Sequence, residues 1–135
     1  MPLALHHLAI VVSDLSRAEA FYVEVLGLPV ERRWNDEDGR HRSTWVNLAA
    51  GFLALERAGA EGPTRTDLAP GLHCLALQIA PGERESWRAR LAAAGHPVER
   101  ESPFTLYVRD PDGHLVGLST YPRESGDAPG HPRET

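Results

Sequence analysis

Apolar and polar positions in the first half of the chain predict one helix among several strands. Residues 5–12 form a short apolar run, which is typical of a buried strand. After Asp14 or Ser16 as an N-cap, apolar residues recur at helical spacing, and Gly27 and Pro29 then end the helix. Three further strands are predicted at residues 30–34, 42–48 and 52–56. The first half therefore has the order strand, helix, three strands.

The second half of the chain repeats this order. A strand is predicted at residues 71–79 and a helix at residues 83–94, ended by Gly95 and Pro97. Three strands follow at residues 98–100, 104–109 and 114–120. The last two are joined by Asp110-Pro111-Asp112-Gly113, where proline presets one backbone angle and glycine takes the positive-φ corner.

Matching residues support a duplication. Leu5-His6-His7-Leu8-Ala9-Ile10 corresponds to Leu72-His73-Cys74-Leu75-Ala76-Leu77 at an offset of 67. We therefore predict an α+β fold of two tandem βαβββ modules, which form a concave, partly open barrel-like sheet around a cleft. The modules are predicted at residues 1–58 and 71–121, with a linker at 59–70 and a disordered tail at 122–135.

Composition narrows the class of protein. The chain has 135 residues, which suits a single compact domain, and its net charge of −5 argues against nucleic-acid binding. The apolar runs are too short to span a membrane, and we expect neither a signal peptide nor a membrane partner. A single cysteine excludes an intrachain disulfide framework, so we expect a cytoplasmic protein. All 14 basic residues are arginines, which excludes a lysine Schiff base.

The duplicated unit resembles the vicinal oxygen chelate superfamily, which includes glyoxalase I, extradiol dioxygenases, fosfomycin-modifying enzymes and bleomycin-resistance proteins. The resemblance extends over residues 5–121 and is carried by three segments, at residues 7–14, 21–28 and 107–115. It implies a cleft for a small molecule and a homodimer. In metal-dependent members it also implies one divalent ion (Zn, Ni, Fe or Mn), held by the first and last strands of both modules.

The metal positions that the resemblance implies are only partly occupied by ligand residues. His7 matches the first-strand histidine, and Glu56 is the candidate carboxylate of the first module. The second-module histidine position is Cys74, with His73 one residue earlier. The final glutamate position, four residues after the glycine of the turn, is Gly117. The candidate metal ligands are thus His7, Glu56 and Cys74, and the loss at Gly117 leaves open that no metal binds.

Two functions therefore compete. The first is a glyoxalase/bleomycin-resistance/dioxygenase-like protein that binds a small organic molecule in the cleft, with a degenerate or absent metal site. The second is a metal-dependent lyase, isomerase or dioxygenase of the glyoxalase I or extradiol type. Gly117 and Cys74 favour the first, whereas His7 and Glu56 favour the second. Candidate ligand-binding residues are three aromatic residues on predicted strands, for which core packing is the competing interpretation: Trp45, Phe52 and Tyr107.

Overall fold

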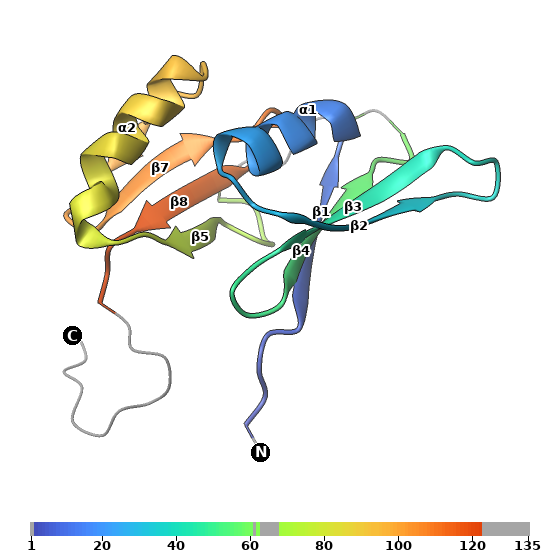
Figure 1. The fold of residues 1–135 in the computed structure, drawn as a ribbon, viewed down its shortest axis with the longest axis horizontal. Coiled ribbons are helices and arrows are strands. Elements are labelled where there is room, and N and C mark those ends of the chain that lie inside the picture. The colour runs from blue at the N-terminus through green and yellow to red at the C-terminus, as the bar shows by residue number, and fades with distance from the viewer. Residues whose placement is uncertain (1, 61, 63–67, 123–135) are drawn as a thin grey trace.

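The computed structural model describes residues 2–60, 62 and 68–122. In the first module, four strands form one sheet in the order β1-β4-β3-β2, with β1 parallel to β4 and the other neighbours antiparallel. A helix crosses one face of this sheet (Figure 1). The elements are β1 (His7–Val12), α1 (Leu15–Glu19), a π-helical turn η1 (Ala20–Val25), β2 (Val30–Asn35), β3 (His41–Asn47) and β4 (Phe52–Arg57).

The second module repeats the topology, with strand order β5-β8-β7-β6 and β5 parallel to β8. Its elements are β5 (Leu75–Gln78), a 3-10 turn η2 (Pro81–Glu83), α2 (Arg84–Ala93), β6 (Arg100–Glu101), β7 (Thr105–Arg109) and β8 (Leu115–Ser119). The predicted α+β fold of two βαβββ modules is confirmed, as two separate open sheets. Both β5 and β6 are shorter than predicted. Most of the predicted linker and tail, residues 61, 63–67 and 123–135, lies outside the described residues.

The first helix begins as its sequence predicts and then widens. Asp14 is the N-cap, and its side chain accepts a hydrogen bond from the Arg17 backbone N–H. From Ala20 onward the helix is π-helical, and the Leu26 N–H bonds to the Phe21 carbonyl five residues earlier. Glu19 fastens the helix to the sheet, because its carboxylate accepts hydrogen bonds from Arg33 and Thr44. The Arg33 hydrogen bond is the main reason that the pKa of Glu19 lies below its ordinary value.

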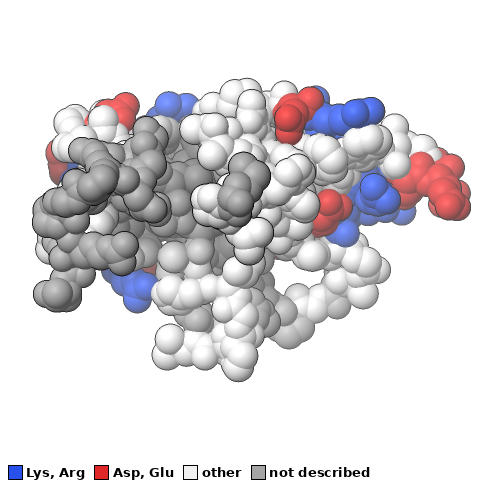
Figure 2. All heavy atoms as spheres, turned by 90° about the horizontal axis from the view of Figure 1, so that it is seen from below, with Lys and Arg blue, Asp and Glu red and all other residues white. Residues whose placement is uncertain are grey.

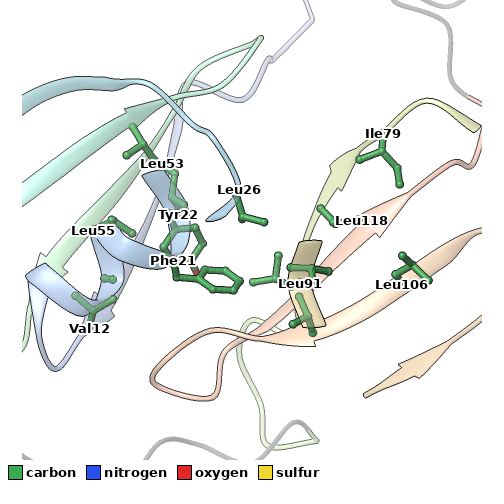
Figure 3. Close-up of a cluster of buried hydrophobic side chains, with 14 of the residues drawn as sticks. Val12, Phe21, Tyr22, Leu26, Leu53, Leu55, Ile79, Leu91, Leu106 and Leu118 are labelled. Carbon is green, nitrogen blue, oxygen red and sulfur yellow. The ribbon is translucent and has the colours of Figure 1, made fainter. Parts of the chain in front are cut away.

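The hydrophobic core is continuous across both modules (Figure 3). Phe21 and Tyr22 are fully buried between the two sheets, where they contact residues of each. The Phe21 ring also packs edge-on against His96 of the second module, with centroids 4.7 Å apart. Because one helix supplies core to both sheets, neither module completes its core alone.

A buried hydrogen bond joins the modules. The Tyr22 hydroxyl donates to Asp110 Oδ2 at 2.8 Å, and both residues are at most 4% exposed. Asp110 Oδ1 accepts from two backbone N–H groups of its own turn, those of Asp112 and His114. The same turn reaches the first module twice more, since Asp112 accepts from the Ser13 N–H and His114 Nε2 lies 2.9 Å from the Val11 carbonyl.

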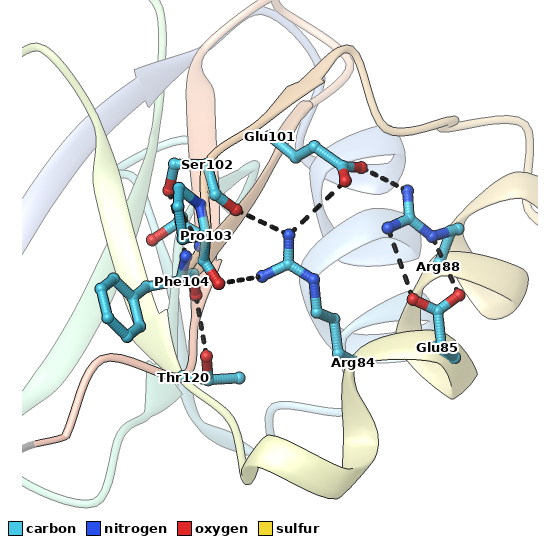
Figure 4. A network of polar contacts seen from close by, with 9 residues as sticks. Arg84, Glu85, Arg88, Glu101, Ser102, Pro103, Phe104 and Thr120 are labelled. Atoms are coloured by element: carbon cyan, nitrogen blue, oxygen red, sulfur yellow. Dashed lines mark hydrogen bonds and ion pairs between the residues drawn. The ribbon is translucent and has the colours of Figure 1, made fainter.

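The second helix is held to its own sheet by arginines (Figure 4). Arg84 donates to the carbonyls of Ser102 and Pro103, and Arg88 pairs with both Glu85 and Glu101. These contacts lie at the surface, so each contributes little to stability, and they mainly orient the helix. Among the described residues, no helix is long and apolar enough to cross a membrane.

The Tyr22 hydrogen bond yields a stability prediction. Tyr22→Phe leaves Asp110 Oδ2 buried without that donor, so we expect a loss of about 1–3 kcal/mol in the free energy of unfolding. Denaturant titration at pH 7 measures it. Tyr107→Phe is the matched control, because the Tyr107 hydroxyl has no hydrogen-bond partner among the described residues. Equal stability of the two variants would contradict the role of Tyr22.

The same variant should alter the alkaline limit of stability. Burial, reinforced by the charge of Asp110, raises the pKa of Tyr22 far above its ordinary value. The folded state therefore keeps the phenol neutral at pH values where the unfolded chain ionises it, so wild-type stability should fall above about pH 10. In Tyr22→Phe, the free energy of unfolding should therefore fall less steeply with pH above about pH 10. Because the chain has no lysine, few other groups titrate in this pH range.

Candidate functional site

The candidate site lies on the face of the first sheet that turns away from α1. Along β1, alternate residues divide between the two faces. Leu8, Ile10 and Val12 pack against the core, whereas His7 and its alternate neighbours Ala9 and Val11 are exposed. We call this second side the open face. Seen from the side opposite the helices, much of the molecule's surface is uncharged, and acidic side chains gather at the end formed by the β2–β3 hairpin (Figure 2).

The strand register arranges the open face in three cross-strand rows, whose members lie side by side on neighbouring strands. The first row contains His7 of β1, and the second contains Ala9. The third contains Val11 and reaches all four strands of the sheet. In order from β1, the rows are His7–Phe52–Asn47, Ala9–Ala54–Trp45–Arg32 and Val11–Glu56–Ser43–Trp34.

Aromatic rings stack across these rows. The His7 and Phe52 rings are parallel within 8° and 4.8 Å apart, and Phe52 stacks on Trp45 at 4.4 Å. Trp34 meets Trp45 edge-on at 5.4 Å, and the Arg32 guanidinium covers the Trp34 ring at 3.8 Å. The structure thus brings two of the three predicted ligand-binding residues, Trp45 and Phe52, beside the predicted metal ligand His7.

Tyr107, the third predicted ligand-binding residue, lies on the other sheet. Its row there is Ala76–Gly117–Tyr107–Arg100. Gly117 is buried beneath its neighbours, since an added Cβ would lie 3.0 Å from the Thr105 methyl and 3.4 Å from the Tyr107 ring. The space where a side chain at residue 117 would begin is therefore largely filled.

The internal repeat identifies the counterpart of Gly117 in the first module. The offset of 67 that relates the modules makes Ala76 the counterpart of Ala9. Ala76 pairs with Gly117 and Ala9 pairs with Ala54, so Ala54 is the counterpart of Gly117. Neither module carries a carboxylate at this equivalent position.

The predicted metal ligands do not gather into a set. Glu56 is on the same face as His7, but its partner on β1 is Val11. Val11 is four residues after His7, so the two positions are about 13 Å apart along the strand. His7 Nδ1 lies 2.9 Å from His6 Nδ1, and Cys74 is half-buried directly before β5. In the part of the chain that the structure describes, no three His, Cys, Asp or Glu residues are grouped to hold a metal ion. Within the described residues of this chain, His7, Glu56 and Cys74 therefore do not form a divalent metal centre.

A cavity of about 280 Å³ lies between the modules. It follows the free edge of β1, where Ala9 and Val11 each begin a row of the open face. Its walls are mainly apolar, and its polar side chains are Tyr22, His73, Cys74 and His114. The remaining lining residues are Leu8, Ala9, Ile10, Val11, Leu72, Leu75, Gly113, Leu115 and Val116.

Sequence reasoning did not identify Ser43 as a site residue. Ser43 Oγ and Trp34 Nε1 are buried side-chain atoms without a hydrogen-bond partner among the described residues. The alternation of the strand at 42–48 would have placed Ser43 on the face of Trp45. Nothing in the sequence indicates that its hydroxyl is unpartnered.

The architecture defines a two-module α+β protein with a cavity of about 280 Å³ between its modules. Residues 4–118 match the model of the Glyoxalase/Bleomycin resistance protein/Dioxygenase superfamily. The chain belongs to this superfamily, which confirms the resemblance seen in its sequence.

Individual relatives are similar over most of this chain. The virulence protein STM3117 of Salmonella typhimurium is 31% identical, with 85% of this chain and 82% of the relative covered. The glutathione transferase FosA of Serratia marcescens is 30% identical, covering 85% and 79%. Among solved structures, a glyoxalase family protein from Enterococcus faecalis has a TM-score of 0.72 at 26% identity, covering 86% of this chain and 96% of its own.

The fold is also shared with the fosfomycin resistance protein FosX from Listeria monocytogenes. Its structure in complex with Mn(II) and 1S,2S-dihydroxypropylphosphonic acid has a TM-score of 0.70 at 21% identity. The match covers 89% of this chain and 94% of FosX. At this identity the similarity concerns the fold.

The position of His7 depends on a close backbone contact, which yields a prediction. Gly51 has φ +81°, and a Cβ there would collide with the His6 carbonyl oxygen, which accepts the Phe52 N–H. Gly39 has φ +77° with nothing within 4 Å. Gly39→Ala should lower the free energy of unfolding by about 1–2 kcal/mol, because alanine disfavours the left-handed backbone. Gly51→Ala should lower it by about 1–3 kcal/mol more, because its Cβ also collides with the His6 carbonyl oxygen. Equal unfolding free energies for the two variants would contradict this contact.

Proposed function

We propose that the protein binds a small organic molecule in the cavity between its modules without a metal ion. One observation carries this proposal: the two equivalent carboxylate positions are occupied by Ala54 and Gly117. Neither residue has a side-chain atom that can bind a metal or take a proton. The ring of Tyr107 and the methyl of Thr105 pack closely around the place where a side chain of residue 117 would begin.

The character of the cavity supports the proposal. Its volume of about 280 Å³ is near the lower end for small-molecule pockets, and its walls are mainly apolar with a few polar groups. Such walls hold a ligand by excluding water, and the polar groups orient it. The adjoining aromatic rings of Trp45 and Phe52 offer further apolar surface.

The names of the relatives suggest the competing function, a metal-dependent reaction. One relative is called a glutathione transferase, and the FosX complex contains Mn(II). This chain retains a histidine at residue 7, but Glu56 is about 13 Å along the strand from the row of His7. We therefore do not propose a metal-dependent transferase, lyase, isomerase or dioxygenase reaction for this chain. Whether the protein retains a metal ion decides between the metal-independent and the metal-dependent function.

Metal analysis tests the proposal directly. We expect untagged protein, incubated with Mn(II), Zn(II), Ni(II) or Fe(II) and dialysed extensively at pH 7.5, to retain far less than one metal per chain. Elemental analysis by mass spectrometry measures this. His7→Ala is the control: retention of about one metal by the wild type that this variant loses would overturn the proposal in favour of the metal-dependent function.

We further propose that the protein is a cytoplasmic homodimer. Several large apolar side chains are exposed near the free edge of β1 and the entry to β5, including Leu5, Val11 and Leu72. A second copy that covers them removes apolar surface and an open sheet edge from water. We expect sedimentation equilibrium to give twice the 14.8 kDa chain mass. Leu5→Glu should shift the mass towards the monomer, and a monomeric wild type would contradict the proposal.

A further inference from the structure

Three polar side chains without partners share one row of the open face. Glu56, Ser43 and Trp34 are cross-strand neighbours on β4, β3 and β2. No described residue forms a hydrogen bond or ion pair with the Glu56 side chain, and Ser43 Oγ and Trp34 Nε1 are likewise unpartnered. Because buried polar groups are nearly always hydrogen-bonded, the two buried groups of this row, Ser43 Oγ and Trp34 Nε1, require an explanation.

Glu56 is the charged member of this row. It is half-buried, and its sequence neighbour Arg57 is engaged elsewhere, by Asp36 at 2.9 Å. Because Glu56 has no counter-charge among the described residues, its half-buried carboxylate depends on water for hydrogen-bond donors, and covering it with a ligand that brings none would be costly. A ligand that brings N–H donors would remove this cost.

Ser43 and Trp34 add directional groups beside that carboxylate. Ser43 is 1% exposed, and its hydroxyl can both donate and accept, whereas Trp34 Nε1 can only donate. Access to them requires a rotation of the Trp34 side chain, of the kind that commonly accompanies ligand binding. Trp34 lies on β2, the edge strand of its sheet, where the Arg32 guanidinium is stacked over its ring and Trp45 meets it edge-on.

The row is next to both an apolar cavity and an aromatic surface. Val11, its first member, lines the cavity, and Glu56 is one strand away, about 5 Å between backbones. Trp45, in the adjacent row, offers a ring beside Ser43. A flat ligand at the cavity mouth can therefore contact aromatic rings while its polar edge faces the row.

We propose that Glu56, Ser43 and Trp34 bind the amino or amidine edge of a planar nitrogen heterocycle. Two adjacent N–H groups of such an edge match the two oxygens of Glu56 in the fork geometry that carboxylates favour. A ring nitrogen or carbonyl beside them accepts from Trp34 Nε1 or Ser43. Anionic ligands are disfavoured by Glu56, and aliphatic amines lack the flat surface for stacking. This proposal rests on the metal-independent binding function and specifies its ligand class.

The test compares two probes that differ in one group. 2-Aminobenzimidazole presents an amidine-like edge, whereas 2-methylbenzimidazole has the same ring and nearly the same size without the exocyclic amine. Isothermal titration calorimetry with metal-free, full-length protein at pH 7 measures both dissociation constants. We expect the amino compound to bind about tenfold or more tightly than the methyl compound.

Variants assign the difference to the row. Glu56→Gln should weaken binding of the amino compound about tenfold or more and that of the methyl compound less than about twofold. Glu37→Gln, which removes the same charge from the exposed β2–β3 turn, should change neither. Trp34→Phe keeps a ring but removes the N–H, and should weaken both compounds, because each has a ring nitrogen that can accept from Trp34 Nε1.

Ser43→Ala separates binding from folding. Because the Ser43 hydroxyl is buried without a partner, its removal should leave the melting temperature unchanged or raise it. The same variant should weaken binding of the amino compound by several-fold. A lower melting temperature with unchanged binding would show a structural role and overturn the assignment of Ser43.

The outcomes separate this inference from the proposed function. Equal affinity for the two probes, an unaffected Glu56→Gln variant, or no binding of the amino compound at millimolar concentration overturns the ligand class. Each of these leaves the metal-independent function standing if the protein retains no metal. Retention of about one metal per chain overturns the proposed function itself, whatever the affinities of the probes.

Discussion

The hydrogen bond between the Tyr22 hydroxyl and Asp110 fixes how the two modules meet. It is buried, and its acceptor is itself held by backbone N–H groups of the turn that joins β7 to β8. Since the same turn also contacts Ser13 and Val11, one short segment of the second module sets the position of β1. The cavity follows the edge of β1, so its shape depends on this contact.

Duplication gives the molecule two equivalent sheet faces, and the sequence has diverged between them. In the first sheet the open face is lined with rings, and those of His7, Phe52 and Trp45 stack across three strands. In the second, Gly117 allows Tyr107 to lie close to the backbone. In both sheets, rings lie close to the equivalent positions, Ala54 and Gly117.

Glu56 shows how a one-row displacement changes the chemistry open to a residue. In the row of Ala54 its carboxylate would be the counterpart of a side chain at residue 117, but it lies one row further along, beside Ser43 and Trp34. There it is distant from the row of His7 and close to groups that donate hydrogen bonds. The same side chain that suggests a metal ligand in the sequence is in the structure a candidate partner for an organic cation.

The sequence by itself determined the element order, the duplication and the α+β class, because these depend on local periodicity, caps and turns such as Asp14 and the turn at residues 110–113. The resemblance to the superfamily also implied a carboxylate four residues after the glycine of that turn, where this chain has Gly117. The sequence could not determine which residues face one another across strands. Register arises from pairing between segments some 40 residues apart, so only the tertiary structure placed Glu56 opposite Val11 and separated it from His7. Likewise, the unpartnered Ser43 hydroxyl became visible only in the folded chain, because the loss of a hydrogen-bond partner depends on everything packed around it.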